Sequence, residues 1–295
     1  MAKLEALASI TRLSDHVVRV LGQNPGKFTL QGTNTYIIGR QNTYTLIDTG
    51  EGKEEYIPVL ASALRDIAKP SAPTDPDVSD IILSHKHGDH IGGLPSVLAL
   101  LRQLWEERNI SKYFPLATEA TLSSTPTIPS SLQVLHTPGH TADSIAIYVP
   151  SDDALYTADT VLGQGTAVFE DLASLISSLH KMHDFAESKG QKETKLYPGH
   201  GPVVEEGREL IEMYIQHRFE REEQIVRVLG SEEGSKVDPW TTWSIVTKIY
   251  APYPRNLWLP AAHSINLHLK KLEKDGRVKH VGGEGIDSQW VLVKI

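Results

Sequence analysis

The segment at residues 85–90 carries side chains of the types that bind divalent metal ions. It follows the pattern His-x-His-x-Asp-His and contributes His85, His87, Asp89 and His90. Two histidines one residue apart in a tight loop can face one cation, and the aspartate and histidine that follow can face a second. Imidazole nitrogens and carboxylate oxygens suit zinc, and they also suit manganese or iron. The spacing therefore predicts a metal centre without deciding which metal it holds.

Three further candidate ligands follow predicted strands farther along the chain. They are His140, Asp159 and His200, each preceded by a short apolar segment. The chain contains no cysteine, so thiolate ligands, thiolate nucleophiles and disulfides are all excluded. Any metal must therefore be held by imidazole and carboxylate groups alone. The predicted donor set is His85, His87, Asp89, His90, His140, Asp159 and His200.

The hydrophobic pattern predicts alternating strands and helices around these residues. Strands are expected at 17–21, 35–38, 43–47, 80–83, 132–135, 144–149, 154–157 and 195–197. Helices are expected at 54–68, 94–104 and 172–185. The repeating unit is a strand whose end carries a residue of a metal-binding type. This arrangement favours a β-sandwich with helices on its outer faces and a site along one sheet edge.

The character of the chain changes after Pro202. A long amphipathic helix is predicted at 205–229, and two shorter helices are predicted at 243–250 and 260–274. A hairpin is predicted from the strands at 277–281 and 289–293. Two helices followed by a two-stranded wing form a winged-helix-like outline. We therefore expect two domains, one at 1–204 and a helical, winged-helix-like one at 205–295.

The composition is that of an ordinary globular protein, with 40% hydrophobic and 22% charged residues. No apolar run approaches the roughly 18 residues that span a bilayer, so no membrane partner is expected. Residues 1–20 lack an apolar signal core and the Arg-rich character of a transit peptide, which predicts a cytoplasmic location. The net charge of −8 repels polyanions such as nucleic acids. Either a monomer or a homodimer is compatible with the sequence.

Several polar residues near these motifs receive a structural interpretation. Lys86 is expected to face solvent, with a place at the pocket rim facing an anionic substrate as the alternative. For Thr33 and Tyr36, packing and a place near the site are equally compatible with the sequence. The remaining histidines are predicted to be surface or packing residues: His16, His136, His180, His183, His217, His263, His268 and His280.

The ordered set of motifs resembles that of the metallo-β-lactamase superfamily. It consists of the His-x-His-x-Asp-His segment, a Pro-Gly-His ending at His140, the lone Asp159 and a Pro-Gly-His ending at His200. The resemblance implies the α/β class, with a metallo-β-lactamase αββα sandwich and a C-terminal winged-helix-like domain. It also implies that Asp48 is a structural aspartate that supports the loops of the site.

The same resemblance assigns the metal ligands. One cation would be held by His85, His87 and His140, and the other by Asp89, His90 and His200. Asp159 would bridge the two. Two divalent ions are thus expected, with zinc favoured and manganese or iron compatible with the same ligands.

This set of ligands favours hydrolysis over redox chemistry. Two dications less two carboxylates leave a charge of about +2, and a bridging hydroxide reduces it to about +1. Metal-bound water ionises near pH 7, so a nucleophile is available at neutral pH. The remaining positive charge would stabilise the anion that forms when hydroxide attacks a carbonyl or a phosphodiester. Asp89 is expected to be catalytic as well, because it would orient the nucleophile.

Residues 19–36 resemble the beta-lactamase-like protein 2 subgroup and the fungal polyketide thioesterases of the same type. This resemblance leaves two main functions open. The first is hydrolysis of an ester, lactam, lactone or thioester, on a small molecule or on an acyl group bound to a carrier protein or to CoA. The second is endoribonuclease cleavage of single-stranded RNA, favoured by the basic residues of the winged-helix-like tail: Lys270, Lys271, Lys274, Arg277 and Lys279.

The acidic net charge makes the acyl hydrolase the first prediction. A Ser/Pro-rich connection at 123–131 is hypothesised to open the pocket to a small molecule. A non-catalytic metal-binding protein is the third possibility, and it is disfavoured because all seven candidate ligands are present.

Overall fold

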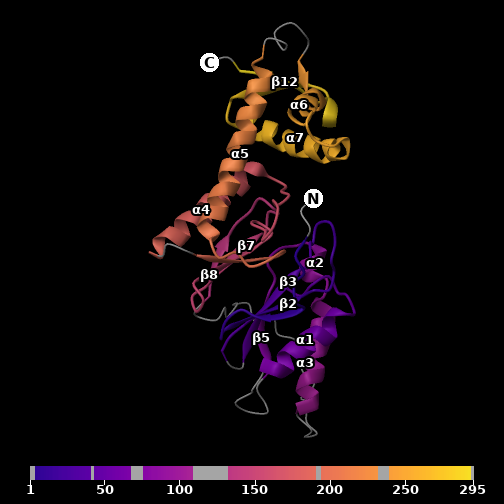
Figure 1. The fold of residues 1–295 in the computed structure, drawn as a ribbon, viewed down its shortest axis with the longest axis vertical. Coiled ribbons are helices and arrows are strands. Elements are labelled where there is room, and N and C mark those ends of the chain that lie inside the picture. The colour runs from indigo at the N-terminus through magenta and orange to yellow at the C-terminus, as the bar shows by residue number, and fades with distance from the viewer. Residues whose placement is uncertain are drawn as a thin grey trace.

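The computed structural model describes residues 4–40, 43–67, 76–108, 132–190, 194–231 and 239–293. Its main body contains two β-sheets (Figure 1). The first sheet has the order β1-β2-β3-β4-β5 and is formed by Ile10–Arg12, Val17–Leu21, Asn34–Ile38, Tyr44–Ile47 and Val78–Ile82. The second has the order β6-β7-β8-β9 and is formed by Gln133–His136, Ile145–Val149, Ala154–Ala158 and Lys195–Pro198. In each sheet the last pair is parallel and the other pairs are antiparallel.

Helices cover the outer face of each sheet. Helices α1 (Tyr56–Ile67) and α3 (Leu94–Arg108) bury apolar residues against the first sheet. Helices α4 (Leu172–Ser188) and α5 (Gly207–Leu229) do the same against the second sheet. The four layers are therefore helices, sheet, sheet and helices, with α1 and α3 on the side opposite α4 in Figure 1.

The alternation of side chains along each strand explains why both faces of the sheets are covered. In β3, Tyr36 lies in the cluster between the sheets, whereas Ile37 lies in the cluster under α1 and α3. In β7, Ile147 faces the other sheet, whereas Ala146 contacts the cluster under α4 and α5. Successive side chains of a strand point to opposite faces, so strands with both faces buried are apolar throughout.

The C-terminal part of the chain forms a smaller unit at the far end of α5 (Figure 1). It contains α6 (Thr242–Ile249) and α7 (Trp258–Lys274), with the short 3₁₀ turns η1 (Arg255–Leu257) and η2 (Gly285–Asp287). Its sheet has the order β10-β12-β11 and is formed by Trp240–Thr241, Gln289–Leu292 and Val278–Gly282. Helix α5 contributes to two cores, since Ile211 packs on the sandwich and Ile225 packs on the C-terminal unit.

The predicted elements are present, with shifts of a few residues at their ends. The predicted two-stranded wing is a three-stranded sheet, because the short β10 pairs with β12. Strand β1 and the one-turn helix α2 (Gly88–Ile91) were not predicted, since neither is long enough to show a hydrophobic period. The connection at 123–131 and the hypothesis about the pocket rim lie outside the described residues. In the described ranges, no helix combines the length and apolar character that crossing a bilayer requires.

Candidate metal centre

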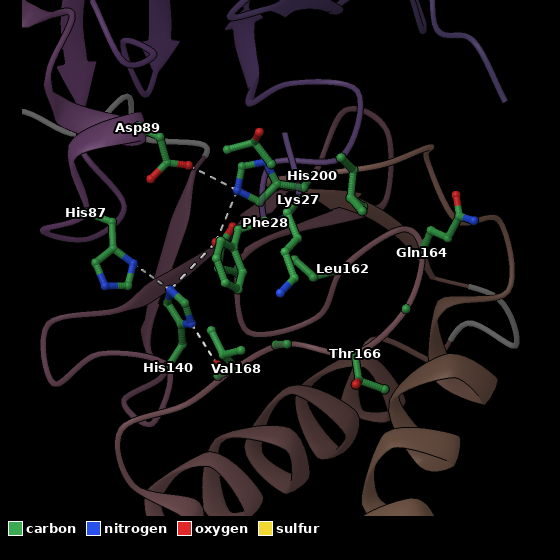
Figure 2. A pocket seen from close by; sticks show the side chains of 15 residues that line it. Lys27, Phe28, His87, Asp89, His140, Leu162, Gln164, Thr166, Val168 and His200 are labelled. Carbon is green, nitrogen blue, oxygen red and sulfur yellow. Dashed lines mark hydrogen bonds and ion pairs between the residues drawn. The ribbon is translucent and has the colours of Figure 1, made fainter. Parts of the chain in front are cut away.

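The strand ends bring all seven candidate ligands to one region of the sandwich. The loop after β5 and the short α2 carry four of them, and His140 follows β6. Asp159 comes directly after β8, and His200 comes shortly after β9. In Figure 2, His87, Asp89, His140 and His200 converge although they come from three segments of the chain. The strands are thus the rigid supports of the site, and the ligands lie on the loops that leave them.

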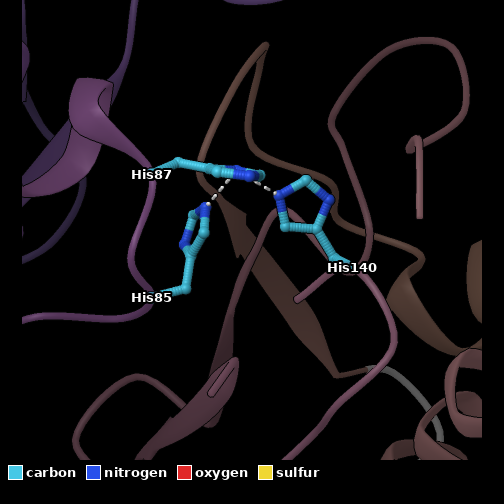
Figure 3. A group of neighbouring side chains, drawn as sticks. All are labelled: His85, His87 and His140. Atoms are coloured by element: carbon cyan, nitrogen blue, oxygen red, sulfur yellow. Dashed lines mark hydrogen bonds between the residues drawn. The ribbon is translucent and has the colours of Figure 1, made fainter. Parts of the chain in front are cut away.

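Three imidazoles form a first triad, which consists of His85, His87 and His140. His87 lies between the other two rings (Figure 3). Its Nδ1 atom is 3.1 Å from Nε2 of His85 and 2.9 Å from Nε2 of His140. Three ring nitrogens that point at one another in this way can donate their lone pairs to one cation.

A second triad consists of Asp89, His90 and His200. The Oδ2 atom of Asp89 is 3.1 Å from Nε2 of His200 and 3.3 Å from Nε2 of His90. Asp159 lies between the triads, because its Oδ2 is 3.2 Å from Nε2 of His200 and 3.6 Å from Nε2 of His140. The carboxylate of Asp159 is therefore placed where one group can reach two cations.

Two buried polar atoms in this cluster test whether the residues fit a metal. The Nε2 atom of His90 and the Oδ1 atom of Asp159 are buried and form no hydrogen bond with the described residues. They are 3.4 Å apart, but their geometry is not that of a hydrogen bond. Buried polar atoms are nearly always satisfied, so exceptions call for a partner such as an ion. Both atoms point into the cluster, so the donor set fits divalent cations.

Asp48 is not a candidate ligand, but it orients the candidate ligand His90 through a hydrogen bond. Its side chain is fully buried after β4, and its Oδ2 accepts a hydrogen bond of 2.6 Å from Nδ1 of His90. The same oxygen accepts hydrogen bonds from the hydroxyl groups of Ser84 and Tyr156. Its Oδ1 accepts a hydrogen bond of 2.7 Å from the backbone N–H of Ser84. Because Nδ1 of His90 donates to Asp48, its Nε2 faces the triad as a lone pair.

Other ligands are oriented in the same way. The Nδ1 of His140 donates to the carbonyl of Val168 over 2.8 Å, and the Nδ1 of His85 lies 3.0 Å from the Ser84 hydroxyl. The hydroxyl of Thr33 donates to Oδ2 of Asp89 over 3.2 Å. Thr33 therefore touches the site directly. Tyr36 instead donates to the carbonyl of Pro198 in the core and packs there.

The glycines of both Pro-Gly-His motifs are needed for close approach. A Cβ on Gly139 would lie 2.4 Å from backbone atoms of Leu175, and the φ angle of Gly139 is +137°. A Cβ on Gly199 would lie 2.3 Å from Oδ1 of Asp159 and 3.0 Å from the ring of His90. The first glycine lets the loop pack on α4, and the second leaves room for two candidate ligands.

Burial and mutual contact shift the titration of these groups. Burial lowers the pKa of His85 to about 3, with repulsion from His90 adding to the effect. Burial alone would raise the pKa of Asp89, but the nearby imidazoles of His200 and His90 hold it well below its usual range. Burial alone would also lower the pKa of His200, but Asp159 and Asp89 raise it to about 9. Since a cation takes the place of protons on its ligands, binding at this site releases protons.

Five of the candidate ligands form the floor of a cavity of about 420 Å³ (Figure 2): His87, Asp89, His140, Asp159 and His200. One wall is the segment 27–30, which contains the exposed Phe28. The opposite wall is the segment 162–168, which contains the exposed Val168. We call these the Phe28 wall and the Val168 wall. Cavities of this volume, with apolar walls and a few polar groups on the floor, suit small organic ligands.

The C-terminal helices hold the Val168 wall in place. The buried Arg218 of α5 donates to the carbonyl of Ala167 over 3.2 Å, and its guanidinium lies 4.8 Å from the ring centre of Phe169. The hydroxyl of Tyr214 donates to the carbonyl of Gly165 over 2.8 Å. Lys274 of α7 pairs with Asp171, the residue that caps α4, at 3.1 Å. The wall is thus attached to both parts of the chain.

The remaining polar residues lie away from the two triads. Lys86 forms an exposed ion pair of 2.9 Å with Glu170 and is not among the residues that line the cavity. None of the eight histidines expected to be surface or packing residues lines the described cavity or joins either triad. Sequence reasoning missed Ser84, Tyr156 and the cavity residue Lys27, because no local pattern marks a residue whose partner is distant in sequence.

Comparison with known families agrees with this architecture. Residues 28–106 and 122–200 match the family described as "Metallo-beta-lactamase superfamily". Residues 241–290 match the family described as "Beta-lactamase associated winged helix domain". A crystal structure of a beta-lactamase domain protein from Burkholderia ambifaria superposes with a TM-score of 0.68 at 16% identity, covering 99% of this chain and 96% of that one. At that identity the likeness concerns the fold alone.

Curated relatives are similar over most of the chain. A protein of Caenorhabditis elegans named "Beta-lactamase-like protein 2 homolog" is 35% identical, over 95% of this chain and 92% of its own. A protein of Passalora fulva named "Atrochrysone carboxyl ACP thioesterase" is 33% identical, over 94% of this chain and 81% of its own. The expected αββα sandwich with a C-terminal winged helix is confirmed. The chain belongs to the metallo-β-lactamase superfamily and is a hydrolase of that fold.

Proposed function

We propose that this chain hydrolyses an acyl thioester, using two divalent cations that the two triads and Asp159 would hold. The observation that carries the proposal is the convergence of all seven candidate ligands in one cluster, five of which line the floor of one cavity with largely apolar walls. Zinc is the expected metal, since imidazole and carboxylate ligands suit it, although manganese and iron(II) fit the same donors.

The residues of the chain have distinct roles in this proposal. His85, His87 and His140 would hold one cation, and Asp89, His90 and His200 the other. Bound divalent cations lower the pKa of water and polarise a carbonyl oxygen, which is the chemistry that hydrolysis needs. Asp89 is held by the Thr33 hydroxyl at 3.2 Å, so its second oxygen can accept a hydrogen bond from a water and orient it. Asp48 keeps His90 turned toward the centre.

The substrate class follows from the cavity and from the names of relatives. Phe28 and Val168 expose 69% and 59% of their surface on facing walls of the cavity, so an apolar acyl group can contact both. Two curated relatives, at 33% and 34% identity, are named as carboxyl ACP thioesterases. A thioester of a carrier-bound or CoA-linked acyl group is therefore a better candidate substrate than a β-lactam.

Cleavage of single-stranded RNA is the second candidate, because it uses the same centre. The sequence argument for it is the five basic residues of the C-terminal winged-helix-like unit. Three of these five form ion pairs within the chain: Lys271 with Glu222 at 3.0 Å, Lys274 with Asp171 at 3.1 Å and Arg277 with Glu223 at 2.8 Å. The charge of these three residues is largely compensated, so the C-terminal unit offers less attraction to phosphate than the sequence alone predicts.

A paired turnover assay tests the proposal. Acyl thioester probes and labelled single-stranded RNA are offered to the full chain, with and without a chelator. We expect thioester cleavage that the chelator abolishes and that added zinc or manganese restores. The variants Asp89→Ala and His140→Ala should lose activity by at least about a hundredfold. The matched control is His136→Ala, because His136 is an exposed histidine four residues before His140.

The outcomes separate the candidate functions. Chelator-sensitive RNA cleavage without thioester cleavage would replace the proposal with the nuclease. Full activity of His140→Ala with unchanged metal content would contradict the assignment of the first triad. The metal content of each variant is measured by elemental analysis, independently of activity.

A further inference from the structure

The charges that face the cavity are unevenly placed. Its floor contains Asp89 and Asp159, both of which are engaged with histidines of the triads. Its walls contain one charged residue in the described part of the chain, which is Lys27. Figure 2 shows the Lys27 side chain extending beside Phe28 into the space above the Val168 wall. A single cation thus stands in walls that are otherwise uncharged.

Lys27 differs from the other lysine near the site. The ammonium of Lys86 is paired with Glu170 at 2.9 Å, so its charge is compensated within the chain. No such ion pair involves Lys27 in the described ranges, where its close contact is with the ring of Phe28, 5.5 Å from the ring centre. The Lys27 ammonium therefore keeps its capacity to bind an anion that enters the cavity.

We propose that Lys27 is a specificity-determining residue that binds an anionic oxygen group carried by the substrate. The inference rests on the proposed function and narrows its substrate class to thioesters with a negative charge away from the reacting carbonyl. The apolar part of such a substrate lies between Phe28 and Val168, while its anion reaches the ammonium beside Phe28. The anion belongs either to the acyl group, as a carboxylate, or to the thiol arm, as a phosphate.

The expected effect is one of binding. Lys27 is a wall residue and does not belong to either triad, so it contacts the ground state and the transition state alike. Loss of such a uniform contact raises KM and leaves kcat unchanged. Both Lys27 and Phe28 are exposed, and an exposed ion pair at the upper end of its usual strength gives a change in KM of about fivefold. The effect should shrink in high salt, because ions screen exposed charges.

The test compares three thioester probes that share one short acyl chain length. One is neutral, one ends in a carboxylate on the acyl side, and one carries a phosphate on the thiol arm. Each is offered to the wild type, Lys27→Met and Lys27→Arg. The control is Lys195→Met, which removes one positive charge from an exposed ion pair with Glu205 at the start of β9. Binding of uncleavable thioether analogues of the three probes is measured in parallel by calorimetry.

We expect Lys27→Met to raise the KM of one anionic probe about fivefold, with the neutral probe within twofold of wild type. Lys27→Arg should restore most of the difference, and Lys195→Met should change nothing. Whichever anionic probe responds identifies the source of the anion. Equal effects on neutral and anionic probes, or no effect on any, would overturn the inference.

Failure of the proposed function is distinguishable from failure of this inference. If no thioester is cleaved, the proposed reaction is wrong. Binding of the thioether analogues then tests, independently of the reaction, whether Lys27 binds an anion. Tighter binding of an anionic analogue that is lost in Lys27→Met would keep the anion site. Equal binding of all analogues by wild type and variant would refute it.

Discussion

Replacing Asp48 by asparagine should weaken metal binding although Asp48 belongs to neither triad. The substitution keeps the size of the side chain. It also suits the backbone, because the φ angle of residue 48 is +59° and asparagine tolerates that region well. What changes is one acceptor oxygen, which becomes an NH₂ group. The variant therefore isolates the hydrogen bonds of the carboxylate from its packing.

The magnitude follows from the contacts of the two oxygens. Oδ2 accepts hydrogen bonds from Ser84, His90 and Tyr156, and an amide nitrogen there would face three donors. With the amide turned the other way, the backbone N–H of Ser84 would face it instead. Breaking such a buried network costs about 3–5 kcal/mol. Loss of the partner that orients a metal-ligating histidine typically lowers metal affinity 10- to 100-fold.

The assay has two readouts on the full chain. Metal affinity is measured by competition with a chromophoric chelator, and the midpoint of thermal unfolding is measured with and without metal. We expect a 10- to 100-fold weaker affinity, and a midpoint lower by roughly 6–10 °C. The control is Asp152→Asn, because the nearly buried side chain of Asp152 accepts a hydrogen bond of 2.5 Å from Tyr197.

Asp152 lies in the turn before β8, whereas the site lies beyond the other end of that strand. Its variant should lower the unfolding midpoint while leaving metal affinity unchanged. If Asp48→Asn binds metal as tightly as the wild type, the reasoning that Asp48 positions His90 is refuted. A loss of affinity in both variants would instead indicate a general effect of destabilisation.

Three further predictions follow from the structure. Gly199→Ala places a Cβ 2.3 Å from Oδ1 of Asp159, so metal affinity should fall at least about tenfold. The control Gly190→Ala should keep its metal, because no atom lies within 4 Å of the added Cβ. Equal metal affinities of the two variants, measured by chelator competition, would contradict the argument. Arg218→Met removes the support of the Val168 wall, so the KM for a thioester should rise about 3- to 10-fold with unchanged metal content. The control Arg221→Met, on the same helix, should have no effect on KM. A wild-type KM in Arg218→Met would show that the wall keeps its shape without Arg218. Burial lowers the pKa of His268 below 6.5; Glu222 opposes this shift, and Arg218 and Arg221 add to it. Below pH 6.5 the unfolded state therefore binds more protons than the folded state. The stability that neutral His268 contributes is present above pH 6.5 and is lost as the pH falls toward the folded pKa. The urea midpoint of the wild type should therefore drop more between pH 7 and pH 5.5 than that of His268→Gln, and parallel curves would count against this account.

Much of the site could be predicted from the sequence because metal ligation demands few residue types. The four donors at residues 85–90 lie within one loop and one helical turn, so their spacing alone predicts a centre. The strands before His140, Asp159 and His200 are short apolar runs, and such runs reveal strands with both faces buried. Elements of two or three residues, such as β10, were missed because they contain too few residues to show a period.

The sequence by itself determined the identity of the candidate ligands, the strands that carry them and the αββα outline. These features are encoded locally, in residue type and in the period of apolar side chains. Only the tertiary structure decided which side chains meet across long stretches of chain. Asp48 reaches Tyr156, 108 residues away, and Lys27 faces a wall that begins at Leu162. Such long-range contacts depend on how the two sheets and their helices pack. That packing is driven by the burial of apolar surface, which is a non-directional interaction. A hydrophobic pattern therefore specifies which faces are buried, whereas the charges that line a cavity emerge only when those faces have been brought together.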